Sequence, residues 1–322
     1  MPSLLDLEPK AWSEANFSDC QLGDVRRTRR LVAYAQQMAE NPDASTPQQT
    51  ENWADCKAAY RLFECSEVDF ESVTAAHYKR TCSMESGTYL VISDTTEIDY
   101  GYKSTRRGLG RLGSVNRRGF FLHSALIVKP HSGTVVGLGA QELFTRSLKK
   151  LDRVHFVKGC RRATEAEVWG RVIDRVAPTN HAVKLIHVCD RGADNFDVFA
   201  HLQVKGDSWV IRVAQLRRKV RTASGEIDKL DNLLQSLPSQ GTYQIYVNAN
   251  NKQKPRWANV EVKATSITLL RPRESTTRFV KEQDIRKVET NVVEVHEVDP
   301  PKGCKAIRWV LYTREPWHRS DY

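Results

Sequence analysis

Two aspartates follow runs of apolar, β-branched residues that have the length of a strand. Asp94 ends the run 89–94, and Asp190 ends the run 183–190. Such runs are typical of buried strands, and a carboxylate at the C-terminal end of a buried strand lies at a sheet edge that ligands and metals reach. Mg²⁺ or Mn²⁺ is commonly held by one or two carboxylates together with phosphate oxygens. We therefore expect Asp94 and Asp190 to be metal-binding and catalytic. The alternative for each is an aspartate that only forms a turn.

The chain around these acids divides into four segments with different residue patterns. Residues 1–80 predict helices, 81–219 alternate strands with helices, 220–313 predict strands separated by polar turns, and 314–322 form a tail. The second segment predicts a mixed sheet covered by helices, in the element order of the RNase-H-like nuclease fold. The third predicts an antiparallel β unit inserted after the fifth strand. The expected fold class is therefore α/β: an RNase-H-like mixed sheet with an antiparallel β insertion and a small N-terminal helical domain.

Particular elements follow from the same patterns. The predicted strands of the core cover 89–94, 120–128, 134–139, 183–190 and 208–213, with helices over 163–176 and from 194 onward. The predicted strands of the β unit cover 242–248, 257–262, 266–270, 291–295 and 306–312, after a short helix over 227–237. In the first segment, Trp53, Cys56, Tyr60 and Phe63 recur at helical spacing and are expected to face a core.

Charge and cysteine content restrict the class of protein. The net charge is +10 and the pI is near 9.3, which favour an anionic partner, most commonly nucleic acid. The seven cysteines are scattered without a zinc-binding spacing, as in a reduced intracellular protein. The N-terminus lacks the basic and apolar regions of a signal peptide, and no run approaches the length of a membrane span. These features predict a cytoplasmic protein.

A cluster of arginines opens the first strongly predicted helix. Arg26, Arg27 and Arg30 follow Gly23 and Asp24, and we expect them to contact the phosphates of double-stranded DNA. The alternative is a solvated charged face, because arginines this closely spaced spread around the whole helix.

Several further stretches resemble the bacterial cut-and-paste transposases of the DDE class, in the Tn-five-like branch of the insertion-sequence-four family. These stretches keep the order of the family along nearly the whole chain, and they are Leu22-Gly-Asp-Val-Arg-Arg-Thr-Arg-Arg-Leu31, Ala59-Tyr-Arg-Leu62, Asp94-Thr-Thr96, Leu109-Gly-Arg-Leu-Gly-Ser114, Arg118-Gly119 with His123-Ser124, Val188-Cys-Asp-Arg-Gly-Ala-Asp194, and Pro300-Pro-Lys-Gly303 with Arg308-Trp309.

The resemblance implies a function for the chain. Asp94 and Asp190 would be the first two DDE acids, binding Mg²⁺ for two-metal cleavage and strand transfer at the inverted-repeat ends of a transposon. The N-terminal helices would bind the transposon end, and the protein would associate with the nucleoid. Arg212 would contact DNA near the active site, although a surface role is equally open. Trp309 would stack on a flipped base, unless it is a core residue of its strand.

The chain departs from the family pattern at its C-terminal end. Family members continue into a helix that carries the third acid, followed by a dimerisation region, and neither signature occurs before Tyr322. Glu315 lies too soon after the last predicted strand, and Pro316 follows it, so we do not assign it as the third acid. We expect a truncated copy, and the alternative function is a catalytically inactive protein that binds transposon ends or inhibits the full enzyme. A simple RNase-H-type nuclease is disfavoured by the basic N-terminal helices and the β insertion.

Overall fold

The computed structural model describes residues 7–102, 106–113, 117–145, 160–249, 254–273 and 277–317. Its contacts divide the chain into two compact units. Unit 1 comprises Met1–Val91, Ser124–Gln141 and Arg175–Lys184, whereas unit 2 comprises Ile92–His123, Glu142–Asp174 and Leu185–Tyr322. The division into four segments stays a prediction, and the end of the predicted tail, from residue 318 onward, lies outside the described residues.

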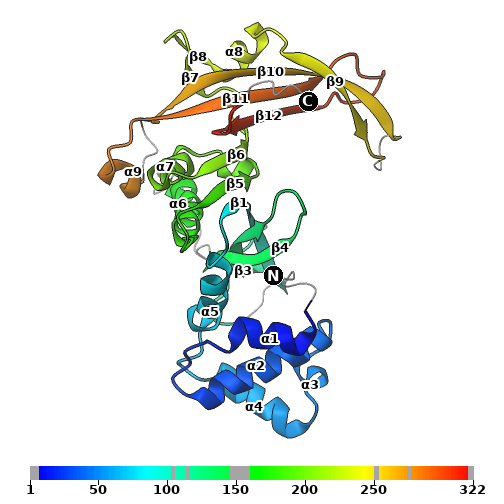
Figure 1. Ribbon diagram of the computed structural model, residues 1–322, viewed down its shortest axis with the longest axis vertical. Helices are drawn as coiled ribbons and strands as arrows, with labels where there is room; N and C mark the ends of the chain where they lie inside the picture. Colours follow the sequence, from blue (N-terminus) through cyan, green and yellow to red (C-terminus); the bar gives the residue numbers. More distant parts are fainter. Residues whose placement is uncertain are drawn as a thin grey trace. The chain divides into compact units, whose positions relative to one another are not determined.

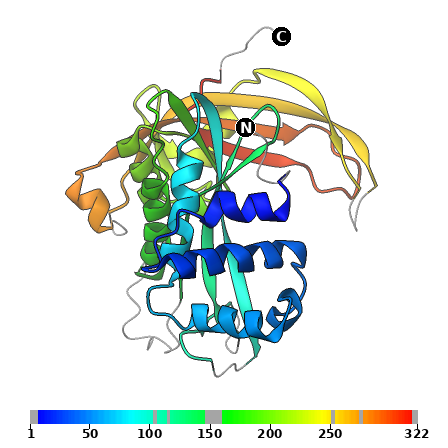
Figure 2. The same ribbon diagram turned by 60° about the horizontal axis from the view of Figure 1, so that its bottom comes forward.

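Unit 1 begins with the predicted helices, drawn in blue to cyan in Figures 1 and 2. They are α1 (Pro9–Phe17), α2 (Val25–Glu40), α3 (Thr46–Gln49), α4 (Trp53–Phe63) and α5 (Phe70–Cys82). Polar side chains cap the first turns of α2 and α4: Asp24 accepts a hydrogen bond from the Arg26 amide, and Asn52 accepts one from the Asp55 amide. Helix α2 contacts both α1 and α4. The small core beneath them contains Leu22, Leu31 and Leu62.

The apolar stripe of α4 does not face this core, and that prediction is wrong for three of its four residues. Trp53, Tyr60 and Phe63 are 66%, 46% and 51% exposed, while Cys56 is buried. Helix α4 instead buries Cys56 together with Ala59 and Leu62. This buried side of α4 faces the core and the neighbouring helices, and the three aromatic side chains lie outside it at the surface.

The fold is mixed α/β, with a twelve-stranded sheet among the described residues. The strands are β1 (Gly87–Tyr102), β2 (Gly110–Arg111), β3 (Arg117–Val128), β4 (Val135–Phe144), β5 (Val183–Cys189), β6 (Ser208–Arg212), β7 (Lys219–Thr222), β8 (Ile227–Lys229), β9 (Gly241–Val247), β10 (Arg256–Leu270), β11 (Lys287–Glu297) and β12 (Arg308–Thr313). Their order is β2-β3-β1-β5-β6-β12-β11-β10-β7-β8, with β4 beside β3 and β9 beside β10. β5 and β6 are parallel, and β12 pairs antiparallel with β6.

The predicted antiparallel pairing of the β unit is confirmed. β10 pairs antiparallel with β11, β9 and β7, and β11 pairs with β12; Figure 1 shows β10, β11 and β12 side by side. The predicted strands 257–262 and 266–270 are wrong as separate elements, because β10 is one strand of 15 residues. The intervening Lys263, Ala264 and Thr265 contain no turn-forming residue, and they continue the ladder with β11.

Helices pack on the sheet of unit 2 and form its main core. They are α6 (Cys160–Arg175), η3 (Arg191–Ala193), α7 (Phe196–Lys205), α8 (Leu230–Ser236) and α9 (Arg278–Glu282). The predicted helices over 163–176 and after 194 correspond to α6 and α7, whereas the predicted helix over 227–237 begins as β8 and becomes α8 only at Leu230. Phe199 of α7 packs edge-on against Trp209 and Tyr312, with ring centroids 5.9 and 5.5 Å away. Buried residues of β5, β6, β12 and α7 all belong to this core.

Candidate metal site and nucleic-acid interface

Asp94 and Asp190 lie at one cavity of unit 2. β1 neighbours β5 in the sheet, and both acids line a cavity of about 590 Å³ together with Glu97, Asp194 and Gln215. Asp190 directly follows β5 and forms the N-cap of η3, as its predicted place at a strand end requires. The structure therefore brings the two predicted metal-binding residues to the same cavity, while their chemical roles stay predictions.

Asp94 does not end its strand, which corrects the predicted boundary. β1 continues to Tyr102, eight residues beyond Asp94. The residues after it include Thr95, Thr96 and Ile98, whose β-branched side chains favour an extended backbone. Asp94 consequently occupies the middle of a long strand, and the part of β1 beyond it extends past the cavity.

The carboxylates of Asp94 and Asp190 each use one oxygen locally. Asp94 Oδ1 accepts a hydrogen bond from the Thr95 amide at 2.7 Å, and Asp190 Oδ1 accepts one from the Gly192 amide at 2.7 Å. Within the described ranges, neither Oδ2 atom has a hydrogen-bond partner and no basic side chain forms an ion pair with either acid. Both residues are exposed. Each thus keeps a carboxylate oxygen available for a ligand.

Neutral groups pack behind the two acids. The buried His123 ring pairs with Thr95 Oγ1 through Nδ1 at 2.7 Å and lies 4.2 Å from the Trp169 ring, centroid to centroid. Burial lowers the pKa of His123 to about 4, so the imidazole is neutral near pH 7. Burial, reinforced by the charges of Asp190 and Asp94, raises the pKa of the Cys189 thiol to about 12. Neither neighbour adds a cation that would neutralise the carboxylates.

Asp94 and Asp190 offer oxygen ligands of the kind that a hard cation takes when its other ligands come from outside the protein. No group of three His, Cys, Asp or Glu side chains that could hold a metal ion occurs among the residues that the structure describes. Mg²⁺ is typically bound by one or two carboxylates while water and phosphate oxygens complete its octahedron. The two free oxygens at Asp94 and Asp190 match this kind of site and do not match an all-protein cage.

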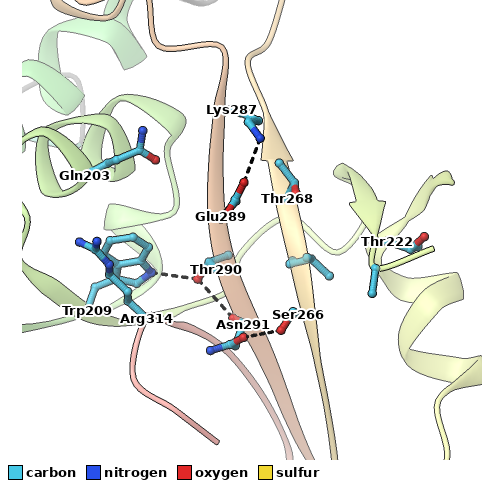
Figure 3. A pocket seen from close by; sticks show the side chains of 12 residues that line it. Gln203, Trp209, Thr222, Ser266, Thr268, Lys287, Glu289, Thr290, Asn291 and Arg314 are labelled. Carbon is cyan, nitrogen blue, oxygen red and sulfur yellow. Dashed lines mark hydrogen bonds and ion pairs between the residues drawn. The ribbon is translucent and has the colours of Figure 1, made fainter. Parts of the chain in front are cut away.

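A larger cavity, of about 770 Å³, lies elsewhere in unit 2 (Figure 3). Its polar side chains already bond to one another: Trp209 Nε1 donates to Thr290 Oγ1 at 3.1 Å, and Ser266 Oγ donates to Asn291 Oδ1 at 2.8 Å. Lys287 forms an ion pair with Glu289 across its rim. Because these charged and polar groups already have partners, this cavity is a weaker candidate than the one at Asp94 and Asp190.

The three predicted DNA-binding arginines of α2 all form ion pairs within unit 1. Arg26 pairs with Asp24 at 2.8 Å, Arg27 with Glu67 at 3.1 Å, and Arg30 with Asp55 at 2.8 Å; Arg27 Nη1 also donates to the carbonyl of Leu22. These pairs are partly or fully exposed, so phosphates can still compete for the guanidinium groups.

Helix α4 presents cationic and aromatic side chains that lie outside the predicted set of DNA-binding residues. Lys57 lies over the exposed Trp53 ring, 5.3 Å from its centroid, and Tyr60 and Arg61 are exposed on the same helix. The helical spacing of these residues could have identified this surface from the sequence, because residues 53, 57, 60 and 61 fall on one helical face. A stripe that mixes aromatic and basic residues in this way is typical of a nucleic-acid surface.

Arg212 and Trp309 lie near each other in the sheet of unit 2 but outside the lining of the acidic cavity. Arg212 is the last residue of β6 and pairs in register with Leu311, two residues from Trp309 on β12. Trp309 is 43% exposed, so it is not a core residue. Their proposed contacts with DNA stay predictions.

The helices at the start of unit 1 match a known family of domains. Residues 9–68, which span α1 to α4, match the family model described as transposase DNA-binding. The match supports a transposase and a DNA partner for this chain. Among the described residues, no helix is both long and apolar enough to cross a membrane.

Proposed function

We propose that this protein is a transposase that binds the ends of a transposon through α1 to α4. The match of residues 9–68 to a transposase DNA-binding model carries the proposal. The net charge of +10 and the exposed basic and aromatic side chains of α4 support a polyanionic partner. The finer assignment is the Tn-five-like branch of the insertion-sequence-four family, whose members act as dimers on inverted-repeat ends in the cytoplasm, at the nucleoid.

The proposed reaction is metal-dependent cleavage and strand transfer by an RNase-H-like core. Asp94 and Asp190 would hold Mg²⁺ or Mn²⁺ through the oxygens that have no other partner. When bound, such an ion polarises the phosphate and lowers the pKa of an attacking hydroxyl. The residues themselves supply negative charge at an open cavity, with neutral His123 and Cys189 behind it. The resemblance implies a third acid after the β unit, and we assign no described residue to that role.

Binding of Mn²⁺ tests the acid pair directly, with the free ion followed by electron paramagnetic resonance. Asp94→Asn and Asp190→Asn should each weaken binding by about tenfold or more, since loss of outer-shell partners alone costs that much in metal sites. Glu282→Gln, at an exposed ion pair on α9, is the matched control and should bind as the parent does. Unchanged affinity in both aspartate variants would show that the cavity is not a metal site.

A second function is an end-binding protein without catalytic activity. This function is favoured because, in the described part of the chain, no three His, Cys, Asp or Glu side chains are grouped so that they could hold a metal ion. A gel shift and a cleavage assay on the same end DNA, with Mg²⁺ present, separate the two functions. Binding accompanied by nicking supports the transposase reaction, whereas binding without nicking supports the inactive protein. Equal affinity for end DNA and a scrambled duplex would contradict both.

A further inference from the structure

The part of β1 beyond Asp94 forms a small arm with the start of β3, which pairs antiparallel with β2. Arg118 and Gly119 of β3 pair with Arg111 and Gly110 of β2, and the Leu112 amide donates to the Arg117 carbonyl at 3.1 Å. The inner side of this arm is packed: Leu112 is 2% exposed and Phe121 is 3% exposed. The arm therefore has a packed inner side and an opposite, outer side.

Arginine and aromatic side chains gather on the outer side. We call Tyr100, Arg106, Arg111, Arg118 and Phe120 the arginine–aromatic face. The Arg106 guanidinium lies 4.8 Å from the centroid of the Tyr100 ring, and this ring lies 5.8 Å from that of Phe120. Arg118 alternates with the inward Gly119 and therefore points to the same side as Phe120. Arg111, opposite Arg118 in the register, shares that side.

The charges on this face are not balanced by the arm itself. Arg111 and Arg118 are directly opposed across the two strands, an arrangement that destabilises a sheet. No described carboxylate forms an ion pair with either residue or with Arg107. The acids of β1 lie elsewhere: Asp99 forms an ion pair with Arg117, and Glu97 lines the cavity of Asp94. Such an unneutralised pair of cations fits a polyanion that supplies the missing charge.

We propose that the arginine–aromatic face binds the phosphate backbone of duplex DNA next to the acid pair. Tyr100 lies six residues beyond Asp94 on the same strand, which is roughly 20 Å at about 3.3 Å per residue. That span corresponds to about six base pairs of duplex. Arg111 and Arg118 contact phosphates, and the stacked Arg106 and Tyr100 lie against the sugar–phosphate edge. This contact deepens the proposed function, because it holds the DNA on which Asp94 and Asp190 would act.

The salt dependence of DNA binding tests this contact in the full chain. We compare the parent with a double Arg111→Gln, Arg118→Gln variant by fluorescence anisotropy, on an end duplex and on a scrambled duplex of equal length. Loss of two phosphate contacts should reduce the slope of log affinity against log salt by about 1.8. Between about 50 and 200 mM salt, the parent should therefore lose about 12-fold more affinity than the variant.

Arg117→Gln is the matched control, because it removes one charge from the same hairpin at a residue already paired with Asp99. Its slope should stay close to that of the parent. The melting temperature of the double variant should be unchanged or higher, because a like-charge repulsion is removed. A lower melting temperature with an unchanged slope would show that the arginines stabilise the fold and would overturn the proposal.

The two duplexes distinguish this proposal from the proposed function. Phosphate contacts are independent of sequence, so the change in slope must appear on both duplexes. A parent protein with no preference for the end duplex refutes transposon-end recognition, yet the slope of the double variant still reports on the arm. Equal slopes for the parent and the double variant, or equal losses in the double variant and Arg117→Gln, overturn the proposed DNA contact.

Discussion

Asp190 and Asp194 are four residues apart and have opposite environments. The Asp190 side chain is exposed and has no ion pair among the described residues, whereas the Asp194 side chain is fully buried. Asp194 Oδ1 lies 2.7 Å from Arg218 Nη1, and its Oδ2 accepts hydrogen bonds from the amides of Ala214 and Gln215. A buried carboxylate is tolerated only with such partners. Asp194 therefore fixes the chain after β6, and Asp190 is left for a ligand.

Replacing Asp194 with Asn should destabilise the protein strongly. The substitution keeps the shape of the side chain but leaves Arg218, which is 13% exposed, without its counterion. Breaking a buried pair of this kind costs about 3–5 kcal/mol. Urea unfolding followed by circular dichroism measures the free energy of unfolding. Glu282→Gln, which breaks an exposed pair with Arg278, should change it by less than about 1 kcal/mol. A loss in Asp194→Asn as small as in this control would contradict the assignment.

The residue types of the candidate site could be predicted from the sequence, but their partners could not. Two acids after apolar runs indicated one sheet edge, and the structure places both at one cavity. Arg218 lies 24 residues from Asp194, and Glu67 lies 40 residues from Arg27. Nothing in local spacing links residues this far apart, so the sequence did not distinguish free charges from paired ones.

At the scale of elements, periodicity predicted which residues share a face but not which face is buried. The α4 stripe of Trp53, Tyr60 and Phe63 has helical spacing, yet the smaller Cys56, Ala59 and Leu62 are buried instead. Both faces of this helix contain apolar residues, so a rule that assigns the larger ones to the core fails. The burial of α4 depends on its neighbours, which are distant in the sequence.

Strand ends were predicted less well than strand existence, for a related reason. Asp94 and Asp190 both follow apolar runs, but only β5 stops at its aspartate. After Asp190 the chain reaches Gly192 and a 3₁₀ turn, whereas after Asp94 β-branched residues continue the strand. An aspartate alone does not end a strand. Its side chain can hydrogen-bond to the nearby backbone and favour a turn, but the strand continues where backbone pairing with neighbouring strands prevails.

Gly119 is required for the arm to pair with β1. A Cβ atom at this position would lie 2.0 Å from the Ile98 carbonyl oxygen and 2.7 Å from Leu112 Cδ1. Gly119→Ala should therefore lower the free energy of unfolding by about 1–3 kcal/mol or more, the cost of forcing atoms into a packed site. Thermal unfolding measures the loss. Gly113→Ala, whose added Cβ meets only Glu97 Oε1 at 4.0 Å, should be nearly neutral. Equal melting temperatures for both variants would show that the close approach to β1 is absent.

At the scale of the whole molecule, three poorly accessible histidines have lowered pKa values. His77 belongs to unit 1, and His123 and His187 belong to unit 2. Burial lowers the pKa of all three, to about 4 for His77 and His123; for His187 it outweighs the opposing effect of Asp207. Two hydrogen bonds favour the neutral ring of His77. Its Nε2 atom accepts a hydrogen bond from the Leu138 amide at 2.9 Å and therefore has no proton, while Nδ1 donates to Asn16 Oδ1 at 2.7 Å.

These histidines should make the protein sensitive to mild acid. In the unfolded chain each binds a proton below a pH of about 6.5, whereas His77 and His123 in the fold resist protonation until about pH 4. The unfolded state therefore binds more protons between those values, and stability falls as the pH decreases through this window. Between pH 7 and 5 the loss is about 2 kcal/mol for each of these two histidines. The carboxylates with lowered pKa values contribute mainly below this range.

Urea unfolding at pH 7 and at pH 5 measures this loss, and a glutamine at one histidine isolates its share. His77→Gln and His123→Gln should each be less stable than the parent at pH 7, because partly buried hydrogen bonds are lost. Their further loss on going to pH 5 should nevertheless be smaller than that of the parent by about 2 kcal/mol. If both variants lose as much as the parent, acid sensitivity originates in groups other than these two imidazoles, and the neutral state assigned to His77 and His123 is wrong.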